Sequence, residues 1–173
     1  MKKGIIIFCS LAVLFAACTK PEPEPTPEPV DYAPLYVGNH IGQINLSINS
    51  INNEPQTNMT FPINNIGIDI AMGSEINTVT ATLTADTESR QTTGTTTAEK
   101  LDFDPVLLVI DKPDQNYSFN LELKMEGTKD NSDTLYVVGS FSGNGKAIFM
   151  GQELIYDEVS GELSGTLVKQ QTR

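Results

Sequence analysis

Hydrophobic and polar residues alternate with a period of two along most of the chain after residue 31. Successive side chains of an extended strand point to opposite faces, so this pattern is typical of strands with one buried and one wet face. The residues expected to face inward are Ile44, Leu46 and Ile48; Ile66, Ile68, Ile70 and Met72; Val79, Ala81, Leu83 and Ala85; and Tyr117, Phe119, Leu121, Leu123 and Met125. Val37 and Ile41 are out of phase with Ile44, which predicts a β-bulge or a sharp bend near Gly42-Gln43.

Further strands are expected at residues 104–110, 134–141, 146–150 with 152–156, and 159–168. The last of these carries small and large residues in turn on one face, which suits the tapering interior of a barrel. These residues are Val159, Gly161, Leu163, Gly165 and Leu167.

Clusters of Asn, Asp, Gly and Pro predict the turns. They lie at residues 52–55, 72–74, 111–116, 127–133 and 143–145. The Thr-rich stretch 89–98 lacks apolar residues and is interpreted as an exposed hairpin tip or loop, and one short helix is allowed for near Thr97–Leu101.

Eight or nine short strands with hairpin-length connections predict an all-β fold, an antiparallel up-and-down meander. Such a meander closes into a small barrel or folds as a β-sandwich. We favour the barrel, because closure removes exposed strand edges. The absence of Trp and the abundance of Thr, Asn, Ser and Gly agree with a β-rich domain, which we place at residues 32–173.

Residues 1–17 place Lys2 and Lys3 ahead of an apolar run that ends in Ala16-Ala17-Cys18. The run is shorter than the roughly 20 residues of a bilayer-spanning helix and has the length and flanks of a secretory signal peptide. Its end resembles the lipobox of bacterial lipoproteins. The resemblance implies cleavage before Cys18 and acyl chains, palmitate among them, that anchor the protein stably in a membrane. The alternative is an ordinary signal peptide that is cut elsewhere.

Residues 18–31 then form a tether in which Pro alternates with Glu. Pro removes amide donors and the Glu residues repel one another, so an extended polyproline II spacer is expected. By resemblance to Gram-negative sorting, Thr19 after the lipidated cysteine favours the outer membrane, on its periplasmic or its cell-surface face. Glu22, Glu24 and Glu28 loosely resemble a surface-export signal.

The formal net charge of −11 makes nucleic acid an unsuitable partner, since acidic surfaces repel phosphate. The chain has two cysteines, Cys9 and Cys18, so the folded domain contains no thiol for a disulfide or a catalytic site. With His40 as the only histidine, we expect neither a catalytic triad nor zinc and interpret His40 as structural or exposed. No cofactor motif is present.

Paired acids occur at Asp102/Asp104, Asp111/Asp114, Asp130/Asp133 and Asp157/Glu158. We interpret them as solvated turn residues, with weak Ca²⁺ binding at 130–133 as the alternative. Asp133-Thr134-Leu135 resembles the short O-glycosylation site of some Gram-negative anaerobes, which makes Thr134 a candidate for modification.

The order of lipobox, Pro/Glu tether, Tyr36-Val37-Gly38, meander and a closing Ser164–Gln170 strand resembles the calycin-like, lipocalin-type β-barrel lipoproteins of Gram-negative bacteria. The resemblance implies an eight-stranded barrel and, for most such proteins, no known activity. We expect a non-enzymatic binding domain for a small apolar ligand or a glycan. The alternative is a protein-binding or inhibitory lipoprotein with a filled barrel, which Phe119, Phe141 and Phe149 favour.

Overall fold

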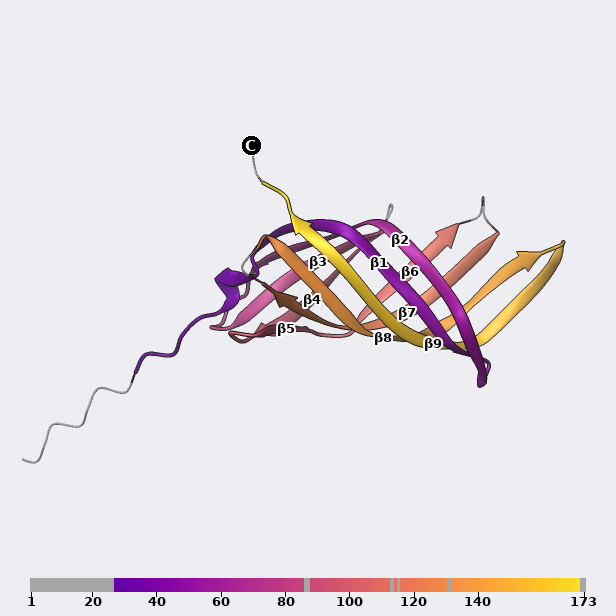
Figure 1. Ribbon diagram of the computed structural model, residues 1–173, viewed down its shortest axis with the longest axis horizontal. Helices are drawn as coiled ribbons and strands as arrows, with labels where there is room; N and C mark the ends of the chain where they lie inside the picture. Colours follow the sequence, from indigo (N-terminus) through magenta and orange to yellow (C-terminus); the bar gives the residue numbers. More distant parts are fainter. Residues whose placement is uncertain (1–26, 86–87, 113, 115, 131, 172–173) are drawn as a thin grey trace, which may run out of the picture.

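The computed structural model describes residues 27–85, 88–112, 114, 116–130 and 132–171, apart from the side chains of Asn58, Lys112 and Phe149. These residues form one short 3₁₀ helix and nine antiparallel strands (Figure 1). The elements are η1 (Ala33–Leu35), β1 (Gly38–Ile51), β2 (Glu54–Met72), β3 (Thr78–Ala85), β4 (Glu88–Thr96), β5 (Lys100–Phe103), β6 (Val106–Lys112), β7 (Tyr117–Lys129), β8 (Thr134–Phe149) and β9 (Gln152–Lys169). Within the same part of the chain, no helix has the length and apolarity needed to cross a membrane.

The strands close into a barrel, which confirms the favoured prediction over the sandwich. Neighbours in sequence pair with one another, and the ring is completed where β1 pairs with β9 and β5 pairs with β7. Eight strands form the ring, while β6 pairs with the first half of β7 and β5 with its second half. The break at Asp104-Pro105 thus divides one barrel position between β5 and β6.

Most residues that the alternating pattern predicts to face inward are buried inside the barrel. All four inward residues of β3 are buried, as are Leu121, Leu123 and Met125 of β7. Val159, Gly161, Leu163 and Leu167 of β9 are also buried, so the small/large face is confirmed. Met72 is an exception at the end of its strand, where it is 45% exposed.

The predicted bulge lies at the expected level but on the neighbouring strand. The register of β1 against β2 shifts between Gly42 and Gln43, and the unpaired residue is Asn65 of β2. Asn65 has a positive φ of 56°, a backbone region that Asn tolerates better than most residues. Strand β1 keeps its even-numbered residues inward, so Ile41 is simply an exposed apolar side chain.

Two turn predictions were wrong, in each case because glycine or polarity suggested a turn inside a strand. Gly143-Asn144-Gly145 lies within β8, and the hairpin turns instead at Met150-Gly151. Gly143 is needed because a Cβ there would overlap the carbonyl oxygen of Asn120 on β7. Likewise residues 127–129 continue β7 instead of forming a turn.

The Thr-rich stretch was also misjudged, because residues 88–96 form β4. Its inward positions are occupied by Gly94 and Thr96, which are buried but carry no apolar signal. No helix forms at Thr97–Leu101, where a turn at Thr97 leads directly into β5.

The strands approach most closely where interior glycines face a neighbouring backbone. A Cβ on Gly42 would overlap the carbonyl oxygen of Thr166 and lie 2.8 Å from Cα of Leu167. Gly67, on the adjacent strand, is different, since its nearest neighbour would be Cβ of Thr84 at 3.9 Å. The contact between β1 and β9 that closes the barrel therefore depends on glycine at position 42.

We expect Gly42→Ala to lower the free energy of unfolding by about 1–3 kcal/mol, because the strands must separate to admit the methyl group. Gly67→Ala is the matched control and should be neutral or slightly stabilising, since it only restricts the unfolded chain. Thermal unfolding followed by circular dichroism measures both. Equal Tm values for the two variants would contradict the steric explanation.

Candidate functional site

The end of the barrel where the N-terminal segment enters is covered. Helix η1 lies across it, and the side chains of Ala33 and Tyr36 are almost fully buried there. The Tyr36 hydroxyl donates to the carbonyl of Thr97 at 3.4 Å, and the Lys129 ammonium donates to the carbonyl of Leu35 at 3.2 Å. We call this end, with η1 and the loops 73–77, 97–99 and 130–133, the closed end.

A polar clamp fixes the incoming segment to the closed end. Asp31 Oδ1 accepts the backbone N–H groups of Ala33 at 3.1 Å and Asn77 at 3.0 Å. Asn77 Oδ1 in return accepts the N–H of Tyr32 at 2.7 Å. This reciprocal arrangement satisfies backbone groups on both segments and sets the point at which the preceding residues leave the barrel.

The opposite, open end is uneven because the β3–β4 hairpin is short. Strand β2 pairs with β3 only from Gly67 to Met72, and its first part, from Glu54 to Ile66, pairs with β1 alone. The β1–β2, β6–β7 and β8–β9 hairpins extend beyond this level (Figure 1). One side of the barrel wall is therefore missing at the open end.

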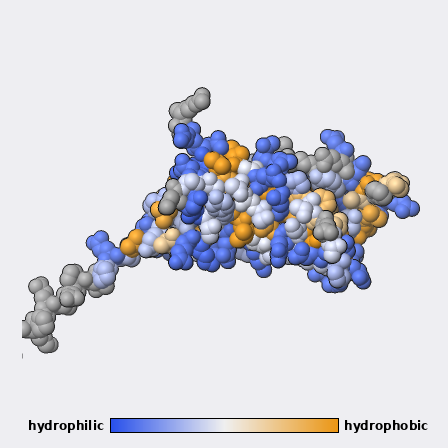
Figure 2. Space-filling view, in the orientation of Figure 1, coloured by the Kyte–Doolittle hydropathy of each residue, from blue (hydrophilic) through white to orange (hydrophobic). Residues whose placement is uncertain are grey.

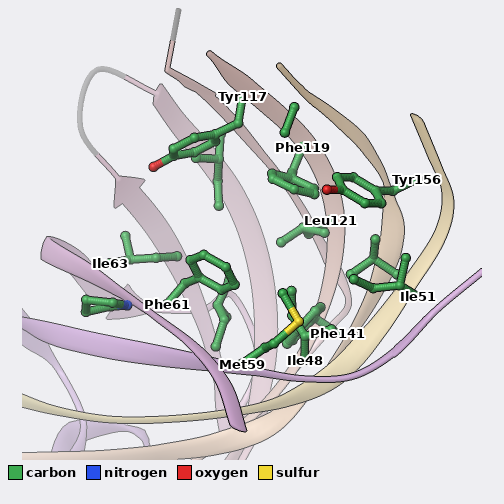
Figure 3. Close-up of a pocket in the computed structure, with 15 residues that line it drawn as sticks. Ile48, Ile51, Met59, Phe61, Ile63, Tyr117, Phe119, Leu121, Phe141 and Tyr156 are labelled. Carbon is green, nitrogen blue, oxygen red and sulfur yellow. The ribbon is translucent and has the colours of Figure 1, made fainter. Parts of the chain in front are cut away.

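An apolar cleft fills the space left by the missing wall (Figure 3). Its cavity volume is about 160 Å³, close to the roughly 150 Å³ of an apolar cavity that holds benzene. The lining consists of Leu46, Ile48, Ile51, Met59, Phe61, Pro62, Ile63, Ile110, Tyr117, Phe119, Leu121, Phe141, Ala147, Tyr156 and Val159. None of these side chains is charged, and their only polar groups apart from backbone atoms are the two tyrosine hydroxyls.

The cleft has a buried floor and a partly exposed rim. Val159, Leu121 and Phe141 are at most 3% exposed, whereas Phe61 on β2 is 49% exposed. Phe119 stacks on Tyr156 with ring centroids 5.9 Å apart and an interplanar angle of 13°. Tyr117 lies beside Phe119 at a centroid distance of 6.0 Å, so three rings form one wall facing β2.

The barrel is thus filled at one end and hollow at the other. Below the cleft the interior is packed with residues such as Ile44, Leu135 and Leu167, none of which is exposed. The prediction of a filled barrel counted Phe119 and Phe141 as core residues. Phe141 is buried in the floor of the cleft, whereas Phe119 lines its opening. The side chain of Phe149 lies outside the described part of the structure.

The projecting β8–β9 hairpin also exposes apolar residues outside the cleft. Met150, at its turn, is 89% exposed, and Ile155 is 61% exposed. Figure 2 shows apolar surface gathered at this end of the molecule. Ala147 and Tyr156 join the inner face of the hairpin to the cleft.

His40 belongs to the packed interior. Of the two interpretations of the sequence, structural or exposed, the structure supports the first. Its side chain is fully buried, and Nδ1–H donates to the carbonyl of Gly38 at 3.1 Å. Nε2 has no hydrogen-bond partner among the described residues. Burial lowers the pKa of His40 below its ordinary 6.5, and the charges of Lys129 and Lys169 act in the same direction.

Asp102, Asp104 and Asp130 make separate local contacts. The hydroxyl of Ser132, and then its backbone N–H at 2.8 Å, donate to Asp130 Oδ1 and lower the pKa of Asp130. Asp102 pairs with Lys100 at 2.8 Å, while Asp104 accepts the Thr93 hydroxyl. Searching the described residues for three or more clustered metal-binding side chains finds no such group.

Of the two candidate modification sites, Thr134 lies apart from the cleft. Thr134 begins β8 at the closed end and is partly exposed, next to the buried Leu135. Cys18 and the tether up to residue 26 lie outside the described residues. The alternating pattern predicts that Tyr117, Phe119 and Leu121 face inward, but it does not predict the cleft that they line.

The sequence matches no protein-family model, and comparison with curated proteins finds no match either.

We expect the protein to lose stability as the pH falls below about 6.5, the ordinary pKa of histidine. Because the folded-state pKa of His40 is lowered, the unfolded chain binds a proton in this range that the native state does not. One such group changes the free energy of unfolding by at most about 1.4 kcal/mol per pH unit.

Urea unfolding of the wild type and of His40→Gln at pH 7.5 and pH 5.5 measures this contribution. Gln cannot titrate, so the variant should lose less stability between the two pH values than the wild type. Identical losses would show that His40 does not cause the effect.

Proposed function

We propose that this protein is a lipid-anchored bacterial envelope lipoprotein whose non-catalytic barrel binds a small apolar ligand in the cleft at its open end. The observation that carries the proposal is the uncharged cleft itself, with its buried floor and aromatic wall. Among the described lining residues there is no carboxylate, imidazole or nucleophilic hydroxyl paired with a base. This supports binding over catalysis.

The chemistry of the lining favours an apolar ligand over a glycan. A sugar presents many hydroxyl groups, and burying them without partners is costly. The side chains of the cleft offer only the hydroxyls of Tyr117 and Tyr156. The volume of about 160 Å³ suits one aromatic ring or a short alkyl segment, with the rest of a larger ligand extending through the open side.

The free edge beside the cleft is poorly suited to pairing with a partner strand. Pro55 and Pro62 lie in the part of β2 that pairs with β1 alone, and Pro lacks the N–H that strand addition needs. The Asn65 bulge further interrupts this segment. Proline and bulges are common devices against edge-to-edge association, so the cleft is better suited to a small molecule.

The position of the clamp supports a defined orientation at the membrane. The chain enters the barrel at the closed end (Figure 1), whereas the residues that line the cleft lie at the far end. With acyl chains on Cys18 in the outer membrane and a stiff tether, the cleft faces away from the anchoring lipid.

We expect Ala147→Phe to abolish binding, because the added ring occupies the cleft from its half-buried wall. The neutral dye N-phenyl-1-naphthylamine, which fluoresces in apolar surroundings, is a suitable probe. Ala71→Phe makes the same substitution on an exposed position of β2 and should retain wild-type binding. If the dye does not bind the wild type, or binds Ala147→Phe equally well, the proposed site is wrong.

The anchor is tested on the protein purified from its native membrane. We expect mass spectrometry to show loss of the first 17 residues and a diacylglyceryl group on Cys18. Cys18→Ser should leave the barrel folded but release it from the membrane fraction. An unmodified Cys18 in native protein would contradict the anchor and leave the cleft proposal intact.

A further inference from the structure

The cleft is uncharged inside, but the segments that build it are acidic. Nearly all lining residues come from three stretches of chain, 51–63, 110–121 and 141–159. These stretches contain six acidic residues and two lysines. They therefore carry a local excess of negative charge in addition to the net −11 of the whole chain.

Two carboxylates lie in the chain directly between residues that line the cleft. Asp157 and Glu158 separate Tyr156 from Val159, and both are exposed. The backbone of Glu158 is held at the β1–β2 turn, since its carbonyl accepts the N–H of Asn52 at 2.7 Å and its own N–H donates to Asn52 Oδ1 at 3.1 Å. These hydrogen bonds fix the Glu158 backbone beside the β1–β2 turn, at the open end of the barrel.

A third carboxylate lies on the outer face of the wall that carries the rings. Asp111 follows Ile110 in the chain and pairs across the strands with Ser118, which lies between Tyr117 and Phe119. All these positions are within about one Debye length, roughly 8 Å at physiological salt, of a lining residue next to them in the chain. A charged group of a ligand at the mouth is therefore exposed to their combined potential.

One of the two lysines is already paired with a carboxylate. Lys146 forms an ion pair with Glu153 at 3.1 Å across the β8–β9 hairpin, so the pair is neutral as a unit. Lys112, next to Asp111, is the other base of these stretches. Asp157 and Glu158 are not among the described ion pairs.

The aromatic wall favours the same sign of ligand charge. Ring faces attract cations, with an energy that increases as the site becomes drier. The Tyr117, Phe119 and Tyr156 rings lie on one wall of the cleft, and its described lining residues include no cationic side chain.

From the acidic mouth and the aromatic wall, we infer that the cleft prefers amphiphiles whose polar group is an ammonium ion over those whose polar group is a carboxylate. The inference rests on the proposed function. The alkyl or aryl body occupies the floor formed by Leu121, Phe141 and Val159. The cation lies at the mouth, between the ring faces and the carboxylates.

The test compares three probes with the same chain length, namely octyltrimethylammonium, octanol and octanoate, below the concentrations at which they aggregate. Displacement of N-phenyl-1-naphthylamine from the full-length protein gives their relative affinities. We expect the ammonium ion to bind about tenfold more tightly than octanoate at low salt, with octanol between them. The ratio should shrink in about 0.5 M NaCl, where charges are screened within about 4 Å.

The double variant Asp157→Asn, Glu158→Gln should reduce the ratio of ammonium to octanoate affinity by about threefold or more and leave octanol binding unchanged. The matched control, Asp69→Asn with Glu75→Gln, removes the same charge from exposed positions near the closed end and should leave the ratio nearly unchanged. Equal effects of the two double variants would assign the preference to net charge and overturn the role of the mouth.

The outcomes separate the two proposals. If octanol binds and octanoate binds as well as or better than the ammonium ion, charge selection is wrong and the apolar site remains. If none of the three probes displaces the dye and the dye itself does not bind, the apolar site is wrong, and the charge preference fails with it.

Discussion

The unequal length of the barrel strands is the constraint on which the rest of the structure depends. Strands β3 and β4 have eight and nine residues, whereas β2 and β9, in the same ring, have 19 and 18. The long strands carry inward apolar residues beyond the level where the short hairpin ends, so no opposing wall covers them. Phe61 remains half exposed for this reason, although burying a large apolar side chain is worth about 1.5–3 kcal/mol. The described residues therefore leave part of the possible hydrophobic stabilisation unused.

The strand pattern and the closed barrel followed from the sequence because both depend on period-two alternation, which Tyr117–Met125 and Val79–Ala85 display clearly. Errors arose where glycine served packing between strands instead of a turn. Gly143 and Gly145 lie within β8 because β7 passes too close for a side chain. Strand β4 was missed because its buried positions are Gly94 and Thr96, which a hydrophobic pattern does not register.

The cleft was harder to predict than the fold, because it depends on what is missing opposite a residue. Alternation places Phe119 inward but does not show that β3 and β4 end before reaching its level. The signal was present in the short alternating run at residues 78–85, compared with the longer runs on either side. Using this signal requires knowing where β3 begins to pair with β2. That position cannot be derived from β1 by simple counting, because the Asn65 bulge shifts the register of β2 against β1 by one residue.

The two ends of the barrel differ in the chemical groups that they present. At the closed end, the Asp31–Asn77 clamp and buried Tyr36 satisfy polar groups and exclude a ligand from below. At the open end, the side chains of the cleft offer only two tyrosine hydroxyls for hydrogen bonding, so under the proposed function affinity comes from apolar contact. Asp31 therefore enters the barrel at the end opposite the cleft, so under the proposed function a ligand and the incoming segment do not compete for the same space.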